Sequence, residues 1–558
     1  MEKEKKMQKL HKQASDIEDE LINIWCEILK ISTIGIHDNF YSTGGNSLNA
    51  LLITLRVRTI FGINLSLDDF LNRPTIHEIA KKIRKGESTE SNKIKTIERT
   101  EFLSPSAAQR RLWFVDQWDP NNPVYNIPLA VRIKGDLDRD IIKMSFQRII
   151  ERHEILRTNF INRDGSPFVI VHKSFSSKIE TLDFTRKSSE EVQNYLDEES
   201  RVPFDLAKDP LCRIKVLEIS HDEHIIVFTM HHIVSDGWSI EILMSELIDI
   251  YSYFLGNKTS LPPEIDIQYL DYAAWHNEYL NSEIIEKQFQ YWENRLAKLP
   301  NNDLIKLDHK RPEIQNSKGT CEFFTIDQND YQSLVEICRQ ENASSFMVLL
   351  TLFYLTIYKT SNVSDITLGT PIANRMQEQT ENIIGFFANM VALRIDTKQS
   401  SSFASLLENV KTEVHNAQKY QEVSFDLLID KLGIKRELNK SPIFQVLFVY
   451  QTLDTSQFNT INLEIEPIII NNKTSKFDLT FTIYESNGKL LCSFEYNTDI
   501  YSQKTILKLK ESYTTLCKQI INDPKTNFND LLAIEDDSAS EINEFNDELL
   551  KFQKSLEN

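Results

Sequence analysis

A run of ten polar residues, Arg84 to Lys93, divides this 558-residue chain into two parts of very different size. A stretch without any hydrophobic period cannot bury enough apolar surface to order itself, so it is typical of a linker. Before this run, apolar residues such as Leu21, Ile24 and Ile28 follow helical spacing. After it, about 440 residues alternate strand-like runs with long amphipathic helices, which is more chain than one core organises. The sequence therefore predicts a small all-helical unit followed by a large α/β body with two lobes.

We expect five segments along the chain: a helical unit at 12–85, a linker at 86–100, two lobes at 101–285 and 286–535, and a tail at 536–558. The two lobes are expected to meet somewhere near Trp275–Pro300. The tail is acidic and only weakly periodic, and we expect it to lead towards a further domain.

The charge balance excludes several classes of partner. Lys and Arg total 63 and Asp and Glu total 82, which gives a formal net charge of −19. Nucleic acids and anionic membranes are polyanions that would repel such a chain, so neither is expected as a partner. No run approaches the roughly 18 consecutive apolar residues of a membrane span. The charged start, Met1 to Lys6, has no apolar segment behind it, so secretion is not expected.

The six cysteines are scattered along the chain, and none forms a C-x-x-C pair. This pattern predicts buried thiols in a reducing compartment rather than a disulfide framework or a zinc site. We therefore expect a cytoplasmic multi-domain protein without a bound metal.

The first candidate site is Ser47, which follows Gly44 and Gly45 at the start of a predicted helix. Two glycines let the backbone turn sharply and present the hydroxyl at a helix N-terminus, where the helix dipole and free N–H groups favour a phosphate. Taken alone, this serine is better explained as an N-cap. About thirty residues later, however, a second motif with Pro-Thr-Ile, Phe70 to Ile76, begins another helix.

Together the G-G-x-S motif and the Phe…Pro-Thr-Ile motif resemble the acyl or peptidyl carrier domains, over about Ser15 to Lys85. The resemblance implies a four-helix bundle in which 4′-phosphopantetheine is attached covalently to Ser47 by a separate phosphopantetheinyl transferase. A thioester on such a flexible arm raises the effective concentration of an acyl group without fixing its position.

The second candidate site follows the apolar, strand-like run Ile225–Met230. The sequence His231-His232-Ile233-Val234-Ser235-Asp236-Gly237 comes directly after it, and an amphipathic helix follows. Ends of rigid strands often hold catalytic side chains in loops. A lone histidine is usually structural, but two adjacent histidines with a nearby Asp-Gly are far less common. The H-H-x-x-x-D-G motif resembles the condensation domains of nonribosomal peptide synthetases, which implies a chloramphenicol-acetyltransferase-like fold.

Further stretches match the same family in chain order: Ser106–Phe114, Arg152–Phe160, Tyr269–Trp275, Ile384–Asn389, Ser441–Val446 and Ser475–Thr480. Two of them depart from the usual pattern, with alanine in place of valine at Ala388 and serine in place of histidine at Ser441. The match covers about Leu103 to Asp530. The motifs look most like the subclass that joins an L-configured donor to an L-configured acceptor, and they differ from heterocyclisation and epimerisation domains.

The resemblance assigns roles to the motif residues. His232 is the family's active histidine, and it could act as a general base or simply orient the attacking amine. His231 is expected to hold the loop. Gly237 is expected to let the backbone approach the substrate or to donate an N–H to the developing oxyanion. Ser239 is expected to cap the following helix, with a donor role as the alternative.

Asp236 could orient the imidazole as in a catalytic triad. The family pattern instead implies that this aspartate points away from the histidine and pairs with an arginine, which fixes the loop. Arg157 is the candidate partner, with Arg311 in reserve. Asn389 and Gln445 are further candidates to face the substrate channel.

In this family, a carrier directly upstream of a condensation domain normally supplies the donor thioester. A downstream carrier is then expected to bring the acceptor amine, and an upstream adenylation domain or synthetase to supply the activated amino acid. The sequence thus predicts peptide-bond formation. Alternatives are a non-catalytic docking module that recruits partner enzymes in trans, or another acyltransferase of the same superfamily. The intact His-His-x-x-x-Asp-Gly motif favours the first hypothesis.

Overall fold

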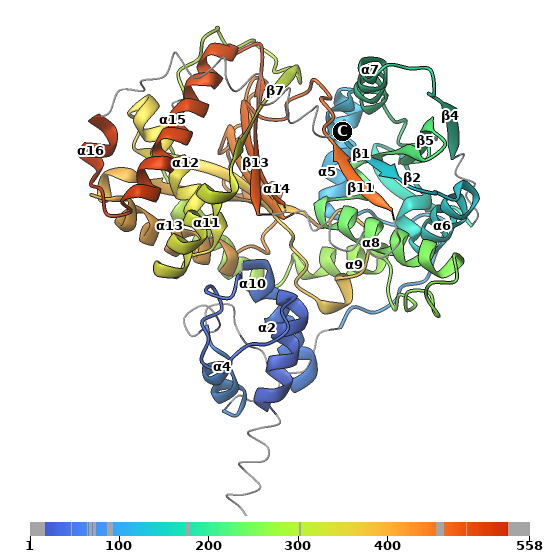
Figure 1. Cartoon of the computed structure of the whole chain (residues 1–558), viewed down its shortest axis with the longest axis horizontal. Helices are drawn as coiled ribbons and strands as arrows, with labels where there is room; N and C mark the ends of the chain where they lie inside the picture. The colour runs from blue at the N-terminus through green and yellow to red at the C-terminus, as the bar shows by residue number, and fades with distance from the viewer. Residues whose placement is uncertain are drawn as a thin grey trace, which may run out of the picture.

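The computed structural model describes residues 17–45, 47–63, 65, 70, 74–85, 93–173, 179–300, 303–452, 463–486 and 488–533. They form a small helical unit and two larger lobes, each built on a β-sheet with helices packed against it (Figure 1). This arrangement confirms the predicted multi-domain fold, with an all-helical unit ahead of a two-lobed α/β body. The predicted tail at 536–558 lies outside the described residues.

Aromatic side chains form the core of the helical unit. Its described helices are 17–29, α2 (Ser47–Phe61) and α4 (Ile76–Ile83). Trp25, Phe40 and Phe70 are fully buried, and their ring centroids lie 4.9–5.5 Å apart. Large aromatic rings suit so small a unit, because each buries much apolar area per residue. Residues 12–16 and 71–73 lie outside the described part of the chain, and the fourth helix stays a prediction.

Residues 93–100 of the predicted linker run along the N-lobe. Ile94 is buried, and its backbone N–H donates to Gln379 Oε1 at 2.8 Å. The N–H of Ile97 donates to Asp271 at 2.7 Å, and Arg99 pairs with the same carboxylate at 2.7 Å. This half of the linker is therefore fixed to the body. Residues 86–92 are not among those described.

The N-lobe contains a five-stranded sheet in the order β11-β1-β6-β5-β4. Helices α6 and α8 cover one face of this sheet, and α7 covers the other. Because both faces are covered, the central strand β6 reads as a continuous apolar run. The elements are β1 (Asn126–Lys134), β4 (Glu180–Asp183), β5 (Cys212–Ser220), β6 (Glu223–His231), β11 (Glu464–Ile468), the hairpin of β2 (Thr158–Arg163) and β3 (Ser166–Val171), α5 (Ala107–Trp118), α6 (Arg139–Arg152), α7 (Ser189–Ser200), α8 (Gly237–Phe254) and α9 (Tyr269–Tyr279).

The C-lobe contains a six-stranded sheet in the order β7-β13-β12-β10-β8-β9. Helix α12 is buried along most of its length, which explains its nearly unbroken apolar sequence. The elements are β7 (Gly319–Ile326), β8 (Asp365–Ile372), β9 (Asn389–Asp396), β10 (Val446–Thr452), β12 (Leu479–Ser486), β13 (Lys489–Asn497), α10 (Glu283–Arg295), α11 (Gln328–Gln340), α12 (Ser345–Ser361), α13 (Phe403–Lys419), α14 (Phe425–Lys431), α15 (Gln503–Asn522) and α16 (Phe528–Ala533).

Two segments from the second half of the chain cross over to the N-lobe. Strand β11 pairs antiparallel with β1, with Ala130 opposite Ile468, and forms the edge of the N-lobe sheet (Figure 1). Ile384 and Phe387, from the loop between β8 and β9, are buried in the N-lobe core. This crossing loop brings residues of the second half of the chain to the end of β6. The predicted division of the lobes between residues 285 and 286 does not account for these two crossings. Pairing between distant segments has no local sequence signal from which it could have been predicted.

Within the described residues, no single helix has the length and apolarity to cross a membrane, although α11 and α12 meet both criteria when taken together across a bend of 104°.

The six cysteines are all free thiols. Four of them are buried, as predicted, whereas Cys26 and Cys321 are only half-buried.

Candidate active site

The motif His231–Gly237 joins a buried strand to a long helix. Strand β6 ends at His231, the 3-10 turn η3 spans His232–Val234, and α8 begins at Gly237. The turn is held at both ends because the strand and the helix pack into the same core. This strand–turn–helix arrangement is the one that the sequence predicts.

One ring nitrogen of His232 is fixed by the backbone. Its Nδ1 lies 2.9 Å from the carbonyl oxygen of Ser235, so Nδ1 carries the proton and Nε2 keeps a lone pair. Because Nδ1 bonds this carbonyl and not Asp236, the triad alternative is excluded. The ring of Phe386 packs edge to face at 4.9 Å. Burial, followed by the nearby charge of Lys476, lowers the pKa of His232 to about 3, so the imidazole is neutral at pH 7.

The motif remains open to solvent at two positions. His232 is half-buried and Gly237 is exposed, whereas the four residues between them, 233–236, are buried. The ring of His232 therefore does not lie in a sealed core. The buried residues fix the backbone of the turn, while His232 keeps part of its surface exposed.

His231 supports the turn. It is buried, and its Nδ1 accepts a hydrogen bond from the N–H of Ile233 at 3.1 Å, which caps η3. Burial lowers the pKa of His231 to about 3. Its ring lies between those of Tyr125 and Phe204, at centroid distances of 6.3 and 6.1 Å. These contacts support the expected structural role.

The predicted pairing of Asp236 with Arg157 is wrong, and so is the reserve partner Arg311. Asp236 pairs with Arg375, whose Nη2 lies 3.3 Å from Asp236 Oδ1. Both side chains are nearly fully buried, with 2% and 1% exposed. Arg157 donates instead to the carbonyl oxygen of His172 at 2.6 Å, and Arg311 forms an ion pair within the C-lobe. The pairing follows from the crossing loop, which places Arg375 beside the start of α8.

Asp236 also fixes the crossing loop to the motif. Its Oδ1 accepts from the N–H and the hydroxyl of Ser239, at 2.9 and 2.7 Å. Its Oδ2 accepts from the N–H groups of Phe387 and Ala388, at 2.9 and 3.2 Å. The expected N-cap role of Ser239 is therefore wrong, because α8 begins two residues earlier and Asp236 is its cap. As predicted, the aspartate fixes the loop through an arginine.

Three residues near the motif were not predicted to act there: Arg375, Gln451 and Lys476. Gln451, in β10, brings its Nε2 within 3.0 Å of the position that a Cβ on Gly237 would occupy. A side chain at position 237 would therefore crowd Gln451, and the expected roles of Gly237 towards the substrate and the oxyanion stay predictions. The Nζ of Lys476 lies 5.1 Å from the ring centroid of Tyr125. The sequence shows each of these three residues only as a polar residue in or near an apolar strand. That pattern is too common to identify a site residue.

Motifs that are distant in the sequence meet behind the turn. The hydroxyl of Tyr269 donates to the carbonyl oxygen of Phe386 at 2.6 Å and lies 2.9 Å from Ser106 Oγ. A Cβ on Gly385 would come within 1.9 Å of the Tyr269 ring, so only glycine fits there. Gln109 donates from Nε2 to a backbone carbonyl of the turn at 2.9 Å. These residues hold the active loop and need not touch a substrate.

The two candidates for the substrate channel have backbone partners instead. Asn389 is buried, and its amide donates to the carbonyl oxygens of Gln421 and Val423 at 3.0 and 2.8 Å. Gln445 donates to the carbonyl oxygen of Ser441 at 2.8 Å. Asn389 therefore holds a loop rather than facing the channel.

Helix α2 begins at Ser47, after a turn that depends on both glycines. Gly44 has a φ of +89°, in the region that favours glycine. A Cβ on Gly45 would lie 2.4 Å from a ring carbon of Phe40. The turn thus packs tightly over the core, and the N-terminus of α2 at Ser47 offers N–H groups that favour a phosphate. These residues fit a group linked through a phosphodiester, such as phosphopantetheine.

The helical unit docks on the body through the second half of α2. Arg56 lies 3.7 Å from Glu378, in the 3-10 turn η4 (Glu378–Thr380), and 3.5 Å from Glu381. Thr59 also donates to Glu378. Burial, followed by opposing effects of Arg56 and neighbouring carboxylates, raises the pKa of Glu381 to about 7. The carbonyl oxygen of Glu381 accepts from Trp238 Nε1 at 3.0 Å, which connects the docking contact to the active loop.

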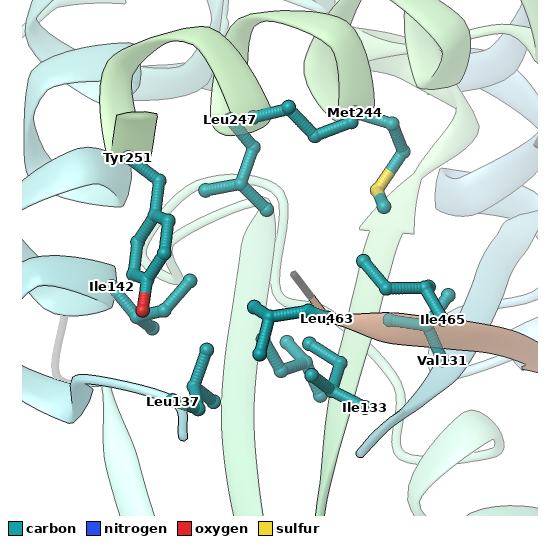
Figure 2. Close-up of a pocket in the computed structure, with 11 residues that line it drawn as sticks. Val131, Ile133, Leu137, Ile142, Met244, Leu247, Tyr251, Leu463 and Ile465 are labelled. Carbon is teal, nitrogen blue, oxygen red and sulfur yellow. The ribbon is translucent and has the colours of Figure 1, made fainter. Parts of the chain in front are cut away.

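A separate apolar cavity lies inside the N-lobe (Figure 2). Figure 2 shows side chains from α8, β1 and β11 pointing into it, among them Met244, Val131 and Ile465. Tyr251 places a hydroxyl beside it, and that hydroxyl accepts from the N–H of Asp138 at 2.9 Å. The lining shares no residue with the motif at His231–Gly237. This cavity is a packing gap rather than part of the site.

Comparison with known proteins finds a matching family for each of the two parts of the chain. Residues 99–543 match the condensation domain family, and residues 19–83 match the family described as phosphopantetheine attachment site. Among solved structures, the X-domain in its complex with OxyB from teicoplanin biosynthesis has a TM-score of 0.70 at 21% identity, covering 80% of this chain and 99% of that one. The condensation domain from the monacolin K polyketide synthase MokA has a TM-score of 0.70 at 18% identity, covering 77% and 99%. These structures share the fold.

Curated relatives are large synthases. Bacitracin synthase 3 of Bacillus licheniformis is 33% identical over 94% of this chain and 8% of its own length. Tyrocidine synthase 3 of Brevibacillus parabrevis is 32% identical over 93% of this chain and 8% of its own length. The chain thus spans less than a tenth of the length of these two relatives. The N-terminal match identifies a domain to which 4′-phosphopantetheine is attached covalently. The chain belongs to the condensation domain family of nonribosomal peptide synthetases, and a phosphopantetheine attachment domain precedes its condensation domain.

Proposed function

We propose that this chain forms a peptide bond in nonribosomal peptide synthesis. The donor aminoacyl or peptidyl thioester is held at Ser47, and the amine of an acceptor aminoacyl thioester attacks it beside His232. The observation that carries the proposal is the geometry of His232. Its Nδ1 is bonded to Ser235, which leaves the Nε2 lone pair unused by that bond, and His232 is a half-buried residue in the turn that leads to the exposed Gly237.

Pantetheine on Ser47 supplies the thiol that holds the acyl group as a reactive thioester. Gly44 and Gly45 shape the turn before α2, and the helix N-terminus favours the phosphate. Arg56 and Thr59 hold the helical unit against the loop that carries Glu378 and Glu381.

In the reaction the amine nitrogen bonds to the carbonyl carbon, the carbon–sulfur bond breaks, and the amine proton finally resides on the departing thiol. The α-amine has an ordinary pKa near 8, so a useful fraction is already neutral at pH 7. The low pKa of His232 makes its protonated form unfavourable. This supports a role in which Nε2 accepts a hydrogen bond from the attacking amine and orients it.

The proposal names partners by their chemistry. A downstream carrier brings the acceptor thioester, an upstream adenylation domain or synthetase supplies the donor, and a phosphopantetheinyl transferase modifies Ser47. We place the reaction in the cytoplasm, in keeping with six free cysteines. The LCL-like subclass, which joins an L donor to an L acceptor, is part of the same proposal.

The test starts with a mass measurement. A phosphopantetheinyl transferase and an aminoacyl-coenzyme A are expected to add one aminoacyl-pantetheine to the chain, and Ser47→Ala is expected to abolish this mass gain. The loaded chain is then mixed with a second loaded carrier, and dipeptide is sought by mass spectrometry. Dipeptide on the acceptor carrier supports the proposal. Loading without any dipeptide would instead favour a non-catalytic docking module.

Docking through Arg56 gives a further prediction. In Arg56→Glu a fourth carboxylate joins Glu27, Glu378 and Glu381, so the donor unit is expected to dock less well and dipeptide formation to slow roughly 10-fold, about 1.4 kcal/mol. The rate with a small soluble donor thioester should stay unchanged, because the body is intact. Lys81→Glu is the matched control, since Lys81 pairs with Glu78 of its own helix. An equal loss with the soluble donor would contradict the docking role.

A further inference from the structure

Lys476 stands on the C-lobe side of the active turn, in the loop before β12. Its Nζ lies 5.1 Å from the ring centroid of Tyr125, and that ring lies 6.3 Å from the ring of His231. The side chain is half-buried, as His232 is. Its charge is the largest influence after burial on the lowered pKa of His232. Lys476 therefore lies against Tyr125, which neighbours the first histidine of the motif, and its charge acts on the imidazole of His232.

Within the described part of the chain, the ammonium of Lys476 has no ion-pair partner. Among the residues that the structure describes, none forms a hydrogen bond or an ion pair with its Nζ, although the charge of Glu495 acts on its pKa. Arg111, the other cation that lowers the pKa of His232, lies 3.4 Å from Asp426. Holding an ammonium away from water without a paired counter-ion costs free energy, and such groups concentrate at functional sites. The free ammonium is thus available to an anion that forms between the lobes.

The proposed reaction creates such an anion. When the amine attacks, the carbonyl electrons move to oxygen and form an oxyanion, which needs hydrogen-bond donors. His232 cannot donate from Nε2, because its proton sits on Nδ1 against Ser235. We propose that Lys476 is a catalytic residue that donates a hydrogen bond to this oxyanion while His232 orients the amine. The intermediate then collapses, the carbonyl re-forms, the thiolate leaves, and Lys476 keeps its proton throughout.

The inference rests on the proposed function, so the experiment tests both peptide-bond formation and the role of Lys476. Single-turnover dipeptide formation is compared for the wild-type chain, Lys476→Met and Lys476→Arg, with both carriers fully loaded. Lys476→Met is expected to be about 10²–10³-fold slower. Lys476→Arg, which keeps the charge and the donors, is expected to stay within about 10-fold of wild type. Lys473→Met, an exposed lysine three residues earlier, is the matched control and should be unchanged.

The pH profile separates catalysis from a structural role. Burial, followed by opposing effects of Glu495 and Arg111, lowers the pKa of Lys476 to about 8. The wild-type rate should rise as the amine loses its proton and fall above pH 8 as Lys476 loses its own, whereas Lys476→Arg should lack the alkaline fall. The titratable or charged groups that face Lys476 from the elements around it are His231, His232, Tyr125, Arg111 and Glu495.

Each outcome has one meaning. The slow Lys476→Met variant, the recovery in Lys476→Arg and an undiminished melting temperature in both would support the inference. A wild-type rate in Lys476→Met would overturn it and leave the proposed function intact. A lowered melting temperature together with no recovery in Lys476→Arg would assign the lysine to packing. Absence of dipeptide from the wild-type chain would overturn both proposals.

Discussion

Replacing His232 with alanine is expected to slow single-turnover dipeptide formation by about 10²–10⁴-fold, the range found when a positioned acid–base group is removed. The imidazole of His232 is the group on the active turn whose lone pair faces away from the backbone, because Nδ1 is bound to Ser235. Loading of Ser47 should be unaffected, since the helical unit has its own core. The measurement is the rate of dipeptide appearance by mass spectrometry, with both carriers loaded beforehand.

His232→Gln separates the two roles that the sequence left open. Its side-chain oxygen can accept a hydrogen bond but cannot store a proton, so partial recovery relative to His232→Ala is expected if His232 orients the amine. The pH–rate profile of the wild type should rise with deprotonation of the amine but show no separate inflection near pH 6.5, because the pKa of His232 is lowered to about 3 and the ring stays neutral above that value. His221→Ala, at an exposed turn, is the control. Equal rates for the Gln and Ala variants would argue for proton transfer instead.

The sequence predicted the placement of the active turn because its signals are local. A buried apolar strand, a polar turn and an amphipathic helix each leave a periodic pattern over a few residues. The roles of His231 and of the glycines before Ser47 follow from the same short stretches. The cap of α8 was assigned to the wrong residue because Asp236 and Ser239 both suit an N-cap, and only the first helical residue decides between them.

What the sequence could not give depends on contacts between distant segments. Arg375 lies 139 residues from Asp236, and no periodicity connects the two. Arg157 was the plausible partner because it belongs to a motif of the same family, but its guanidinium donates to His172. Strand β11 likewise joins β1 across more than 300 residues. In each case the contact depends on how the intervening chain folds, and neither segment shows it in its own sequence.

The buried pair of Asp236 and Arg375 should govern the stability of the active loop. Arg375→Met leaves the Asp236 carboxylate buried without its cation, so the free energy of unfolding of the body is expected to fall by about 3–5 kcal/mol. Arg375 also donates to the carbonyl oxygens of Thr380 and Ile383, and its guanidinium packs 3.9 Å from the ring centroid of Phe387. The crossing loop should therefore loosen together with the start of α8.

Hydrogen exchange tests this directly, because the N–H groups of Phe387 and Ala388 donate to Asp236. These amides should lose protection in Arg375→Met while amides of the helical unit do not change. Arg157→Met is the matched control, and it should cost no more than about 1 kcal/mol, since it removes one hydrogen bond and a long, partly exposed ion pair. A double variant, Asp236→Asn with Arg375→Met, should be less destabilised than the two single losses added together, because it leaves no buried charge unpaired. Strict additivity, or a larger effect of Arg157→Met, would show that this pair does not hold the loop.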